Sequence, residues 1–378
     1  MDFDSAIQLL THSDGYALWV GAGVAIHLAR AGDGGAPTWG EVARRLESAA
    51  GMPPSAGDFP KRLEECLKAL GRARFQKEVR AATLAPLCDA VLRAGRRYQD
   101  PAHCVPPEVR QIAALGALAN PIVNFNVELL TSIALASPGG PYAIRCFNPP
   151  VDELDGLPRT SVGSADGKRF RRAVYHPHGA LESSGICVLA ESEYASMHGT
   201  LAFELATHAA FASRLVIAGM SLEDGYLRSQ LERFMPQLSG VVWFVGAGVR
   251  PDILDWSKAH GVEVVRVASW SAFWSAVGTE LPSPSELDLV LSWQAMLAHA
   301  IDSLNPREYL ATIDGFRRLG APESQLDVWR RLAELAGISM AELQAAPSEV
   351  WDRTRRDILL PTMEAIWSLT VGAQAKAP

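Results

Sequence analysis

Two glycines follow the first apolar run of the chain, in the segment Gly21-Ala22-Gly23. The run Tyr16-Ala-Leu-Trp-Val20 precedes them and Val24-Ala-Ile-His-Leu-Ala-Arg30 follows, which predicts a strand, a tight turn and a helix. Glycine lets a backbone approach a pyrophosphate, and the start of a helix offers N–H groups and the positive end of its dipole. This arrangement suits a dinucleotide. Ile26 occupies the position of a third glycine in G-x-G-x-x-G, so a tight turn without a ligand explains the segment equally well.

Three later segments place polar side chains where other predicted strands end. The asparagines among them could instead cap a helix beginning near Glu128, and the serine and aspartate could form a simple N-cap pair. Side chains alternate along a strand, so we expect His176 to point away from His178 and to serve as a packing or supporting residue. Without its neighbours, His178 would be an ordinary loop histidine. The side chains concerned are Asn124 and Asn126, His176 and His178, and Ser221 and Asp224 after Gly219.

The elements that must position these residues alternate between short Val/Ile-rich runs and helical patterns. Such alternation predicts a parallel sheet covered by helices on both faces. Residues 137–170 are expected to form a Gly/Pro-rich connection. The predicted strands are 16–20, 121–123, 173–175, 214–218, 240–245 and 261–267. The predicted helices are 24–30, 40–50, 61–71, 73–94, 107–119, 128–136, 192–212, 224–235 and 251–260.

The fold class is therefore α/β, a Rossmann-like parallel sheet with a helical insertion and a C-terminal helical domain. After Pro282 only helical periodicity remains, and Ser283-Pro-Ser-Glu286 has the pattern of a capping box. This helical domain has no nucleotide motif, so we expect it to supply oligomer or partner contacts. The predicted boundaries are 1–33 and 110–282 for the sheet domain, 34–109 for the insertion, 283–371 for the helical domain and 372–378 for a tail.

Composition excludes several classes of protein. Of the 378 residues, 48% are hydrophobic and 20% are charged, which fits a globular chain and not a disordered one. Asp and Glu number 42 against 35 Lys and Arg, so we expect no direct partnership with nucleic acid. Met1 to Leu10 lacks the basic start of a signal peptide, and no apolar stretch reaches the ~18 residues of a membrane span.

The cysteines indicate a reducing, cytoplasmic setting. There are 5 of them, an odd number, and no C-x-x-C pair occurs. Neither a disulfide framework nor a zinc site built from thiolates is therefore expected.

Five segments, in order between residues 16 and 271, resemble the bacterial sirtuin-like family. Gly21-Ala22-Gly23 is similar to its first signature, Val123-Asn-Phe-Asn126 to its T-N-Y-D segment, and Tyr175-His-Pro-His-Gly179 to its catalytic H-G segment. Val188-Leu-Ala-Glu-Ser-Glu-Tyr194 resembles the stretch that follows this His-Gly, and Gly219-Met-Ser-Leu-Glu-Asp224 resembles the late G-Y-S-x-x-D turn.

The departures from the family help to select the activity that the resemblance implies. Sirtuin deacylases carry paired cysteines for a structural zinc and a P-D-F-R segment, whereas this chain has unpaired cysteines and Ala36-Pro-Thr-Trp39. A zinc-free chain with a helical insertion is similar to the NAD-consuming sirtuin-like subunits of bacterial antiviral defence. The resemblance therefore implies an NAD+ glycohydrolase that takes NAD+ as its substrate and releases nicotinamide and ADP-ribose.

The resemblance also implies that activity is gated by assembly. Similar proteins pair with a HerA-type hexameric ATPase or with a short Argonaute, or form homo-oligomers. The length of the chain favours a HerA-type partner or self-assembly over an Argonaute-linked module.

The resemblance assigns functions to the polar residues. Expelling nicotinamide leaves an oxocarbenium-like ribose, so the site needs a base and polar groups that hold the leaving carboxamide. His178 is the expected base, since an unperturbed histidine, with a pKa of ~6.5, has its neutral form available at cytoplasmic pH. Asn124 would orient the ribose hydroxyls or the attacking water, and Asn126 would bind the carboxamide. The segment Gly21-Ala22-Gly23, together with Gly219, Ser221 and Asp224, would bind the rest of NAD+.

Two other functions remain open at this stage. Ala25 stands where the family usually has Ser, and Asn126 where it usually has Asp. These changes favour a non-catalytic scaffold that binds NAD+ or ADP-ribose within an assembly. An NAD-dependent protein deacylase is the third alternative.

Overall fold

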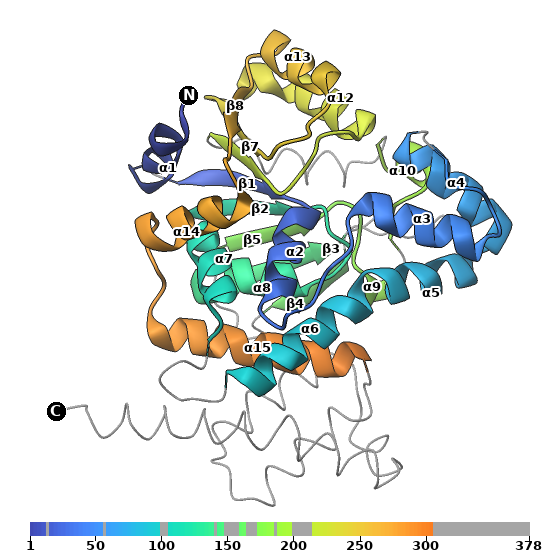
Figure 1. Ribbon diagram of the computed structural model, residues 1–378, viewed down its shortest axis with the longest axis horizontal. Helices are drawn as coiled ribbons and strands as arrows, with labels where there is room; N and C mark the ends of the chain where they lie inside the picture. The colour runs from blue at the N-terminus through green and yellow to red at the C-terminus, as the bar shows by residue number, and fades with distance from the viewer. Residues whose placement is uncertain are drawn as a thin grey trace, which may run out of the picture.

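A computed structural model gives the arrangement of the elements (Figure 1). It describes residues 1–12, 15–55, 58–98, 105–139, 142–146, 159–163, 172–184, 187–198 and 214–304. The strands are β1 Tyr16–Val20, β2 Ala119–Asn124, β3 Tyr142–Cys146, β4 Arg159–Gly163, β5 Arg172–His176, β6 Leu215–Ala218, β7 Val241–Val245 and β8 Glu263–Arg266. The helices are α1 Phe3–His12, α2 Ala22–Arg30, α3 Trp39–Ala49, α4 Phe59–Leu70, α5 Arg72–Ala82, α6 Leu84–Arg97, α7 Pro107–Ala117, α8 Leu130–Ala136, α9 Leu181–Ser184, α10 Glu191–His198, α12 Gly225–Phe234, α13 Pro251–Ala259, α14 Trp270–Glu280 and α15 Glu286–Leu304.

One sheet of eight strands organises the molecule, in the order β4-β3-β5-β2-β1-β6-β7-β8. Every pairing is parallel except that of β3 with β4 at one edge. The chain extends the sheet from β1 through β2 to β5 on one side and then crosses to β6 on the other. The predicted α/β, Rossmann-like fold is confirmed.

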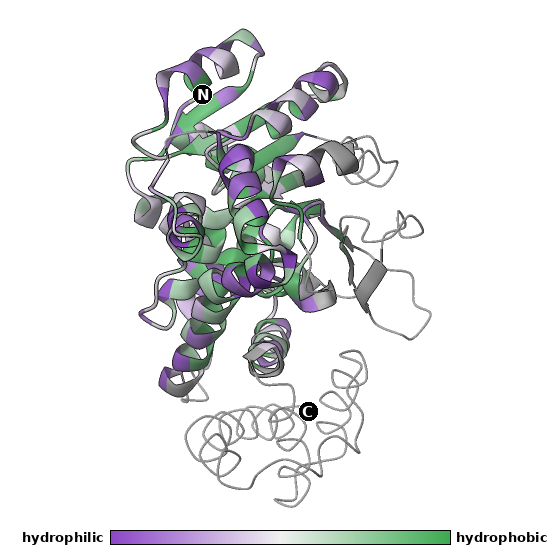
Figure 2. Ribbon diagram, turned by 90° about the vertical axis from the view of Figure 1, so that its right-hand side faces the viewer, coloured by the Kyte–Doolittle hydropathy of each residue, from purple (hydrophilic) through white to green (hydrophobic). Residues whose placement is uncertain are grey.

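The alternation of side chains along each strand divides the core between the two faces of the sheet. In β1, Leu18 and Val20 belong to a buried cluster that includes α2, α7 and α8, whereas Trp19 belongs to a second cluster that includes α12 and α13. Both faces are therefore covered, and β1 is buried at every position. Figure 2 shows the corresponding distribution, with apolar residues in the strands and hydrophilic residues on outer helix faces.

Residues 137–170, predicted as a Gly/Pro-rich connection, contain two strands that were not predicted, β3 and β4. Arg159-Thr-Ser-Val-Gly163 shows no apolar alternation, and as an edge strand it needs none. The helix expected over 73–94 is two helices separated at Thr83. Pro86 has no N–H to donate to the carbonyl of Ala82, so a continuous helix would lose that bond, whereas proline fits the first turn of a new helix.

The helical insertion shares its core with the sheet. Leu46, Leu63 and Phe75 belong to the same continuous buried cluster as Leu18. The predicted range 34–109 therefore describes a topological insertion and not an independently packed unit. None of the described helices combines the length and apolarity that a membrane span requires.

Helix α15 also packs into this core, beside α6 (Figure 1). A Cβ on Gly95 of α6 would lie 2.6 Å from Leu297 Cδ2, and Arg110 binds Glu286 through two hydrogen bonds of 2.5 and 2.6 Å.

The cap predicted at Ser283 and Glu286 is wrong, since Ser285 Oγ accepts the N–H of Asp288 at 3.2 Å. Residues 305–378, which include most of the predicted helical domain and the tail, lie outside the described part of the chain.

We expect a chain ending at Pro282 to be unfolded or aggregated, and a chain ending at Leu304 to fold. The shorter chain loses the fully packed side chains Leu289, Trp293, Met296 and Leu297. At about 1.5–3 kcal/mol each, they account for about 6–12 kcal/mol, which is comparable with the whole stability of a domain. Thermal melts and size-exclusion chromatography compare the two chains. Equal melting temperatures would show that α15 is dispensable.

Candidate active site

The Gly21-Ala22-Gly23 segment and the three polar segments that follow the other strands meet at the carboxyl ends of the sheet strands. They follow β5, β2, β1 and β6, which are consecutive in the sheet. The last residue of β1, Val20, pairs in register with Asn124 at the end of β2 and with Ala218 at the end of β6. In open parallel sheets, ligands bind outside the carboxyl ends of the strands where the strand order reverses. The fold thus brings the predicted site residues to the position where a Rossmann-like protein binds its nucleotide.

The glycines in the β1 and β6 loops allow these loops to pack backbone against backbone. A Cβ on Gly23 would lie 2.6 Å from Gly219 Cα, and Gly23 N–H donates to Gly219 O at 2.9 Å. Gly219 itself has φ of 70°, a conformation that other residues rarely adopt. A Cβ on Gly21 would meet the Met220 side chain at 2.6 Å. The fold therefore requires these glycines whether or not a ligand is bound, and their contact with NAD+ stays a prediction.

The N-terminus of α2 gives this edge a positive potential. Gly21 is its N-cap residue, and no acidic side chain lies in its first turn. The N–H groups of Gly23 and Val24 are bonded to Gly219 O and Gly21 O, at 2.9 and 3.0 Å. Attraction of a phosphate here therefore depends on the helix dipole more than on these two donors.

The asparagines after β2 belong to a buried hydrogen-bond network. Asn124 Nδ2 donates to Ser132 Oγ at 2.9 Å, and Asn124 Oδ1 accepts the N–H of Asn126 at 2.9 Å. Ser132 Oγ also bonds His176 Nε2 at 2.7 Å, and His176 Nδ1 bonds the carbonyl of Asn126 at 3.0 Å. The network closes on itself. It fixes the backbone of the β2 loop against β5.

His176 is a supporting residue in this network. Both of its ring nitrogens are hydrogen-bonded within the protein, and burial lowers its pKa to about 4. A neutral, buried ring of this kind does not exchange protons with a substrate near pH 7.

Asn126 connects two of the loops that form the site. Its Nδ2 donates to Gly21 O at 3.2 Å, which ties the β2 loop to the β1 loop. The capping alternative for the asparagines is wrong, because α8 begins after Leu129 without a side-chain cap, and the N–H of Thr131 is bonded by Glu128 at 3.0 Å.

His178 lies in the turn that follows β5, and its side chain is almost completely buried. Its ring packs edge to face against Phe125 and Tyr194, with centroid distances of 5.4 and 5.1 Å. Gly179 adopts φ of 72° and donates its N–H to His176 O at 3.0 Å. The turn therefore depends on glycine at 179 and carries His178 at the carboxyl end of β5.

Asp224 supports the β6 loop and the start of α12. Its Oδ1 accepts the N–H groups of Tyr226 and Leu227 at 2.9 and 3.3 Å, and its Oδ2 accepts the hydroxyl of Tyr194 at 2.9 Å. Asp224 is thus the N-cap of α12, which is one of the two functions that the sequence suggested for it. Its contact with NAD+ stays a prediction. Ser221 is exposed and lies outside the cap.

Three residues of this edge were not assigned a function from the sequence. Tyr194 contacts His178 and Asp224, Phe125 contacts His178, and Ser132 joins Asn124 to His176. Ser132 had a signal, since Thr131 and Ser132 interrupt an otherwise apolar helix. Tyr194 had only its place in a segment that resembles the family, because its partners are far away in the sequence.

The buried carboxyl group of Glu128, next to the network, should make the stability of the fold depend on pH. Burial, with a contribution from Glu182, raises the pKa of Glu128 from 4.5 to about 7. The unfolded chain loses this proton near pH 4.5, whereas the folded chain keeps it to about pH 7, so stability falls as pH rises between these values. We expect Glu128→Gln, which mimics the protonated acid, to raise the free energy of unfolding at pH 8 by up to about 3 kcal/mol and to change it little at pH 4.5. Urea denaturation at both pH values tests this, and equal stabilities at pH 8 would contradict it.

We expect the protein to bind no zinc. Among the described residues, no group of three or more His, Cys, Asp or Glu could hold a metal ion. Burial raises the pKa of the Cys66 thiol to about 11 and those of Cys88 and Cys187 well above the ordinary value, which disfavours the thiolates that zinc binds. Metal analysis should find less than one equivalent, and chelators should leave the melting temperature unchanged. A stoichiometric zinc whose removal lowers that temperature would contradict the expectation.

The fold and the site together define a Rossmann-like α/β protein with its candidate site where the strand order reverses. Residues 122–265 match the family model of the SIR2-like domain. This range contains the end of β2 and all of β3 to β7, with Asn124, His178 and Asp224. The match supports the resemblance to the sirtuin-like family and implies an NAD-related activity. No curated protein matches the chain at a significant level.

Proposed function

We propose that the protein is an NAD+ glycohydrolase. The observation that carries this proposal is the position of His178 within a SIR2-like domain, at the same sheet edge as the N-terminus of α2. Water adds to the anomeric carbon of the nicotinamide ribose, the C–N glycosidic bond breaks, and its electron pair leaves with neutral nicotinamide. His178 accepts the proton that the water loses. The products are nicotinamide and ADP-ribose.

The remaining residues act on binding and orientation. The positive end of α2 suits the diphosphate of NAD+. Asn124 acts through Asn126 and Ser132, since both ends of its amide bond those residues, and we therefore regard it as a positioning residue. Asn126 joins the β1 and β2 loops and adds no negative charge near the developing cation.

A non-catalytic NAD+- or ADP-ribose-binding scaffold is the second candidate. The observation that favours it is the presence of Ala25 and Asn126 at positions where the family usually has Ser and Asp. For the glycohydrolase, the resemblance to antiviral defence proteins supports a cytoplasmic enzyme whose activity is gated by self-association or by a HerA-type ATPase.

Incubation of the purified protein with NAD+ separates these functions. Free nicotinamide without an acylated peptide supports the glycohydrolase. Release that requires an acylated peptide would show a deacylase. No release in any assembly state resolved by light scattering, combined with ADP-ribose binding measured by calorimetry, would show the scaffold.

A further inference from the structure

The Tyr194 side chain links the histidine loop to the β6 loop. Its ring lies edge to face on His178, at 5.1 Å and 69° between planes, and it stacks on Tyr226 at 5.2 Å. Its hydroxyl donates to Asp224 Oδ2 at 2.9 Å, while Asp224 Oδ1 caps α12. Only 1% of Tyr194 is exposed, so this ring has one fixed place beside the histidine.

Tyr194 is unsuited to proton transfer itself. Burial and the carboxylate of Asp224 raise the pKa of its hydroxyl well above the ordinary value, so the hydroxyl remains a donor at working pH. The carboxylates that act on it are those of Asp224, Glu193 and Asp58. The contribution that remains is to orient His178.

The segment that carries Tyr194 is bonded to the histidine loop and closed by Glu193. Val188 N–H donates to His178 O at 2.8 Å. Glu193 Oε2 accepts the N–H groups of Leu189 and Ala190, both at 2.9 Å, which fixes the start of α10.

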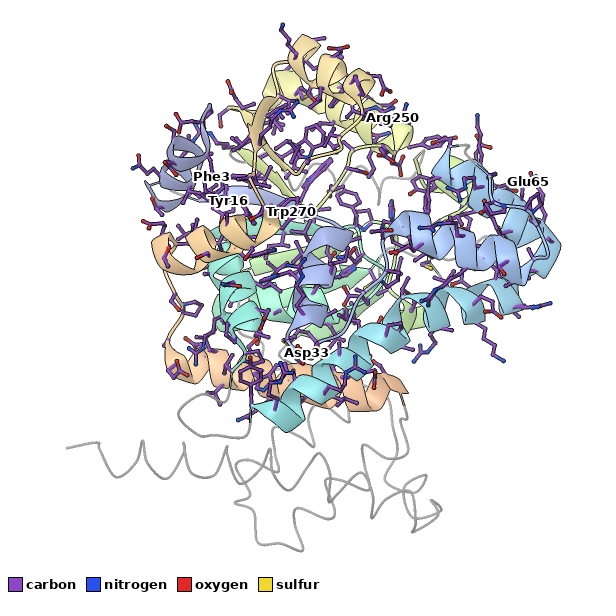
Figure 3. The ribbon with its side chains drawn as sticks, in the orientation of Figure 1. Phe3, Tyr16, Asp33, Glu65, Arg250 and Trp270 are labelled. Atoms are coloured by element: carbon purple, nitrogen blue, oxygen red, sulfur yellow. The ribbon has the colours of Figure 1, made fainter. Side chains whose placement is uncertain are left out.

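Helices α4 and α5 of the insertion hold this segment at three points. Arg72 Nη1 bonds Glu193 Oε1 at 2.5 Å, and Glu64 Oε2 accepts both the N–H and the hydroxyl of Ser192, at 3.1 and 2.6 Å. The thiol of Cys187 lies 3.3 Å from Gln76 Oε1. Glu65, labelled in Figure 3, lies on the outer side of α4, so the contacts with the segment that carries Tyr194 come from the inner side of this helix.

We propose that Tyr194 is a positioning residue for His178 and that the helical insertion keeps it in place through Arg72, Glu64 and Gln76. The insertion thus regulates the same site whose activity is proposed above, and the inference rests on that proposed function. A displacement of α4 and α5 would release the 187–194 segment, and with it the histidine, without any change in the sheet.

Two substitutions test this, each with a matched control. Tyr194→Phe removes the hydroxyl but keeps the ring, and Tyr226→Phe removes a neighbouring hydroxyl, which bonds Glu191 at 3.3 Å. Arg72→Gln removes the bond to Glu193, and Arg74→Gln alters an arginine on the same helix that bonds Ala49 O at 3.2 Å. Arg72 is 42% exposed, so its variant is expected to fold.

We expect Tyr194→Phe and Arg72→Gln to lower kcat for NAD+ cleavage roughly tenfold and to leave KM within about twofold, because misorientation of a base affects the transition state more than binding. Each leaves a nearby carboxylate less compensated, so the pKa of His178 should rise by on the order of 0.5 unit. The acid limb of the kcat/KM profile should move to higher pH accordingly. The controls should match the wild type.

An NMR titration of labelled histidine, assigned with His178→Gln, gives the same shift without any turnover. If the wild type cleaves no NAD+, the proposed function fails while this titration still decides the inference. An unchanged His178 titration in both variants, or an unchanged kcat together with an unchanged acid limb, would overturn it. Equal shifts in the controls would do the same.

Discussion

Replacement of His178 by alanine should slow nicotinamide release by about 10²–10⁴-fold, the usual contribution of a general base. The histidine accepts the proton of the attacking water, and the rings of Phe125 and Tyr194 that contact it do not accept protons near pH 7. Release is measured by chromatography of reaction mixtures at saturating NAD+.

The His178→Ala substitution should also destabilise the fold, which truncation of an exposed loop histidine would not do. The ring of His178 is packed between two aromatic side chains, so its truncation leaves a cavity. His178→Gln keeps more of the volume and should lose the same activity with a smaller change in melting temperature. His260→Ala, which removes a histidine 37% exposed in its side chain, is the control. A rate unchanged by His178→Ala and His178→Gln would remove His178 from the mechanism.

Gly23→Ala should have the second largest effect, a loss of about 3 kcal/mol in the free energy of unfolding. The added Cβ would lie 2.6 Å from Gly219 Cα and 3.1 Å from Gly219 O, and these backbone atoms cannot rotate away. The β1 and β6 loops must then separate, which should also abolish NAD+ binding. Urea denaturation and calorimetry with NAD+ measure the two effects.

Gly35→Ala is the matched control for this substitution. Apart from Gly35 and its two chain neighbours, no described residue has a heavy atom within 4 Å of a Cβ built on Gly35, so the same chemical change should leave stability and binding nearly unaltered. If Gly23→Ala and Gly35→Ala unfolded at the same urea concentration, the close packing of the two loops would not matter to the fold.

The existence of the central strands could be predicted because their apolar runs are buried on both faces. β1 and β7 are buried at every position, and such runs are distinct in the sequence. The edge strand β4 was missed because an edge strand can be polar, and the break at Thr83 was missed because the apolar period continues through it. The packing of α15 against α6 depends on contacts between distant segments, which no local pattern reports.

The candidate site, like the fold, could be predicted only in part. Its four segments could be placed together, since the carboxyl ends of parallel strands share one edge. The hydrogen-bond partners of each side chain could not be predicted. Asn124 was expected to contact the ribose or water, whereas its amide bonds Ser132 and Asn126, and the Tyr194 bond to Asp224 joins residues 30 apart. The glycines, expected for a ligand, are also required by packing between loops.

A crystal structure of the His178→Gln variant with NAD+ would show whether the nicotinamide ribose binds beside residue 178, because the slow variant should retain the intact substrate. We expect NAD+ at the carboxyl ends of β5, β2, β1 and β6, with its nicotinamide ribose beside residue 178 and its diphosphate toward the N-terminus of α2. NAD+ bound elsewhere, or no bound NAD+ at saturating concentration, would contradict this expectation.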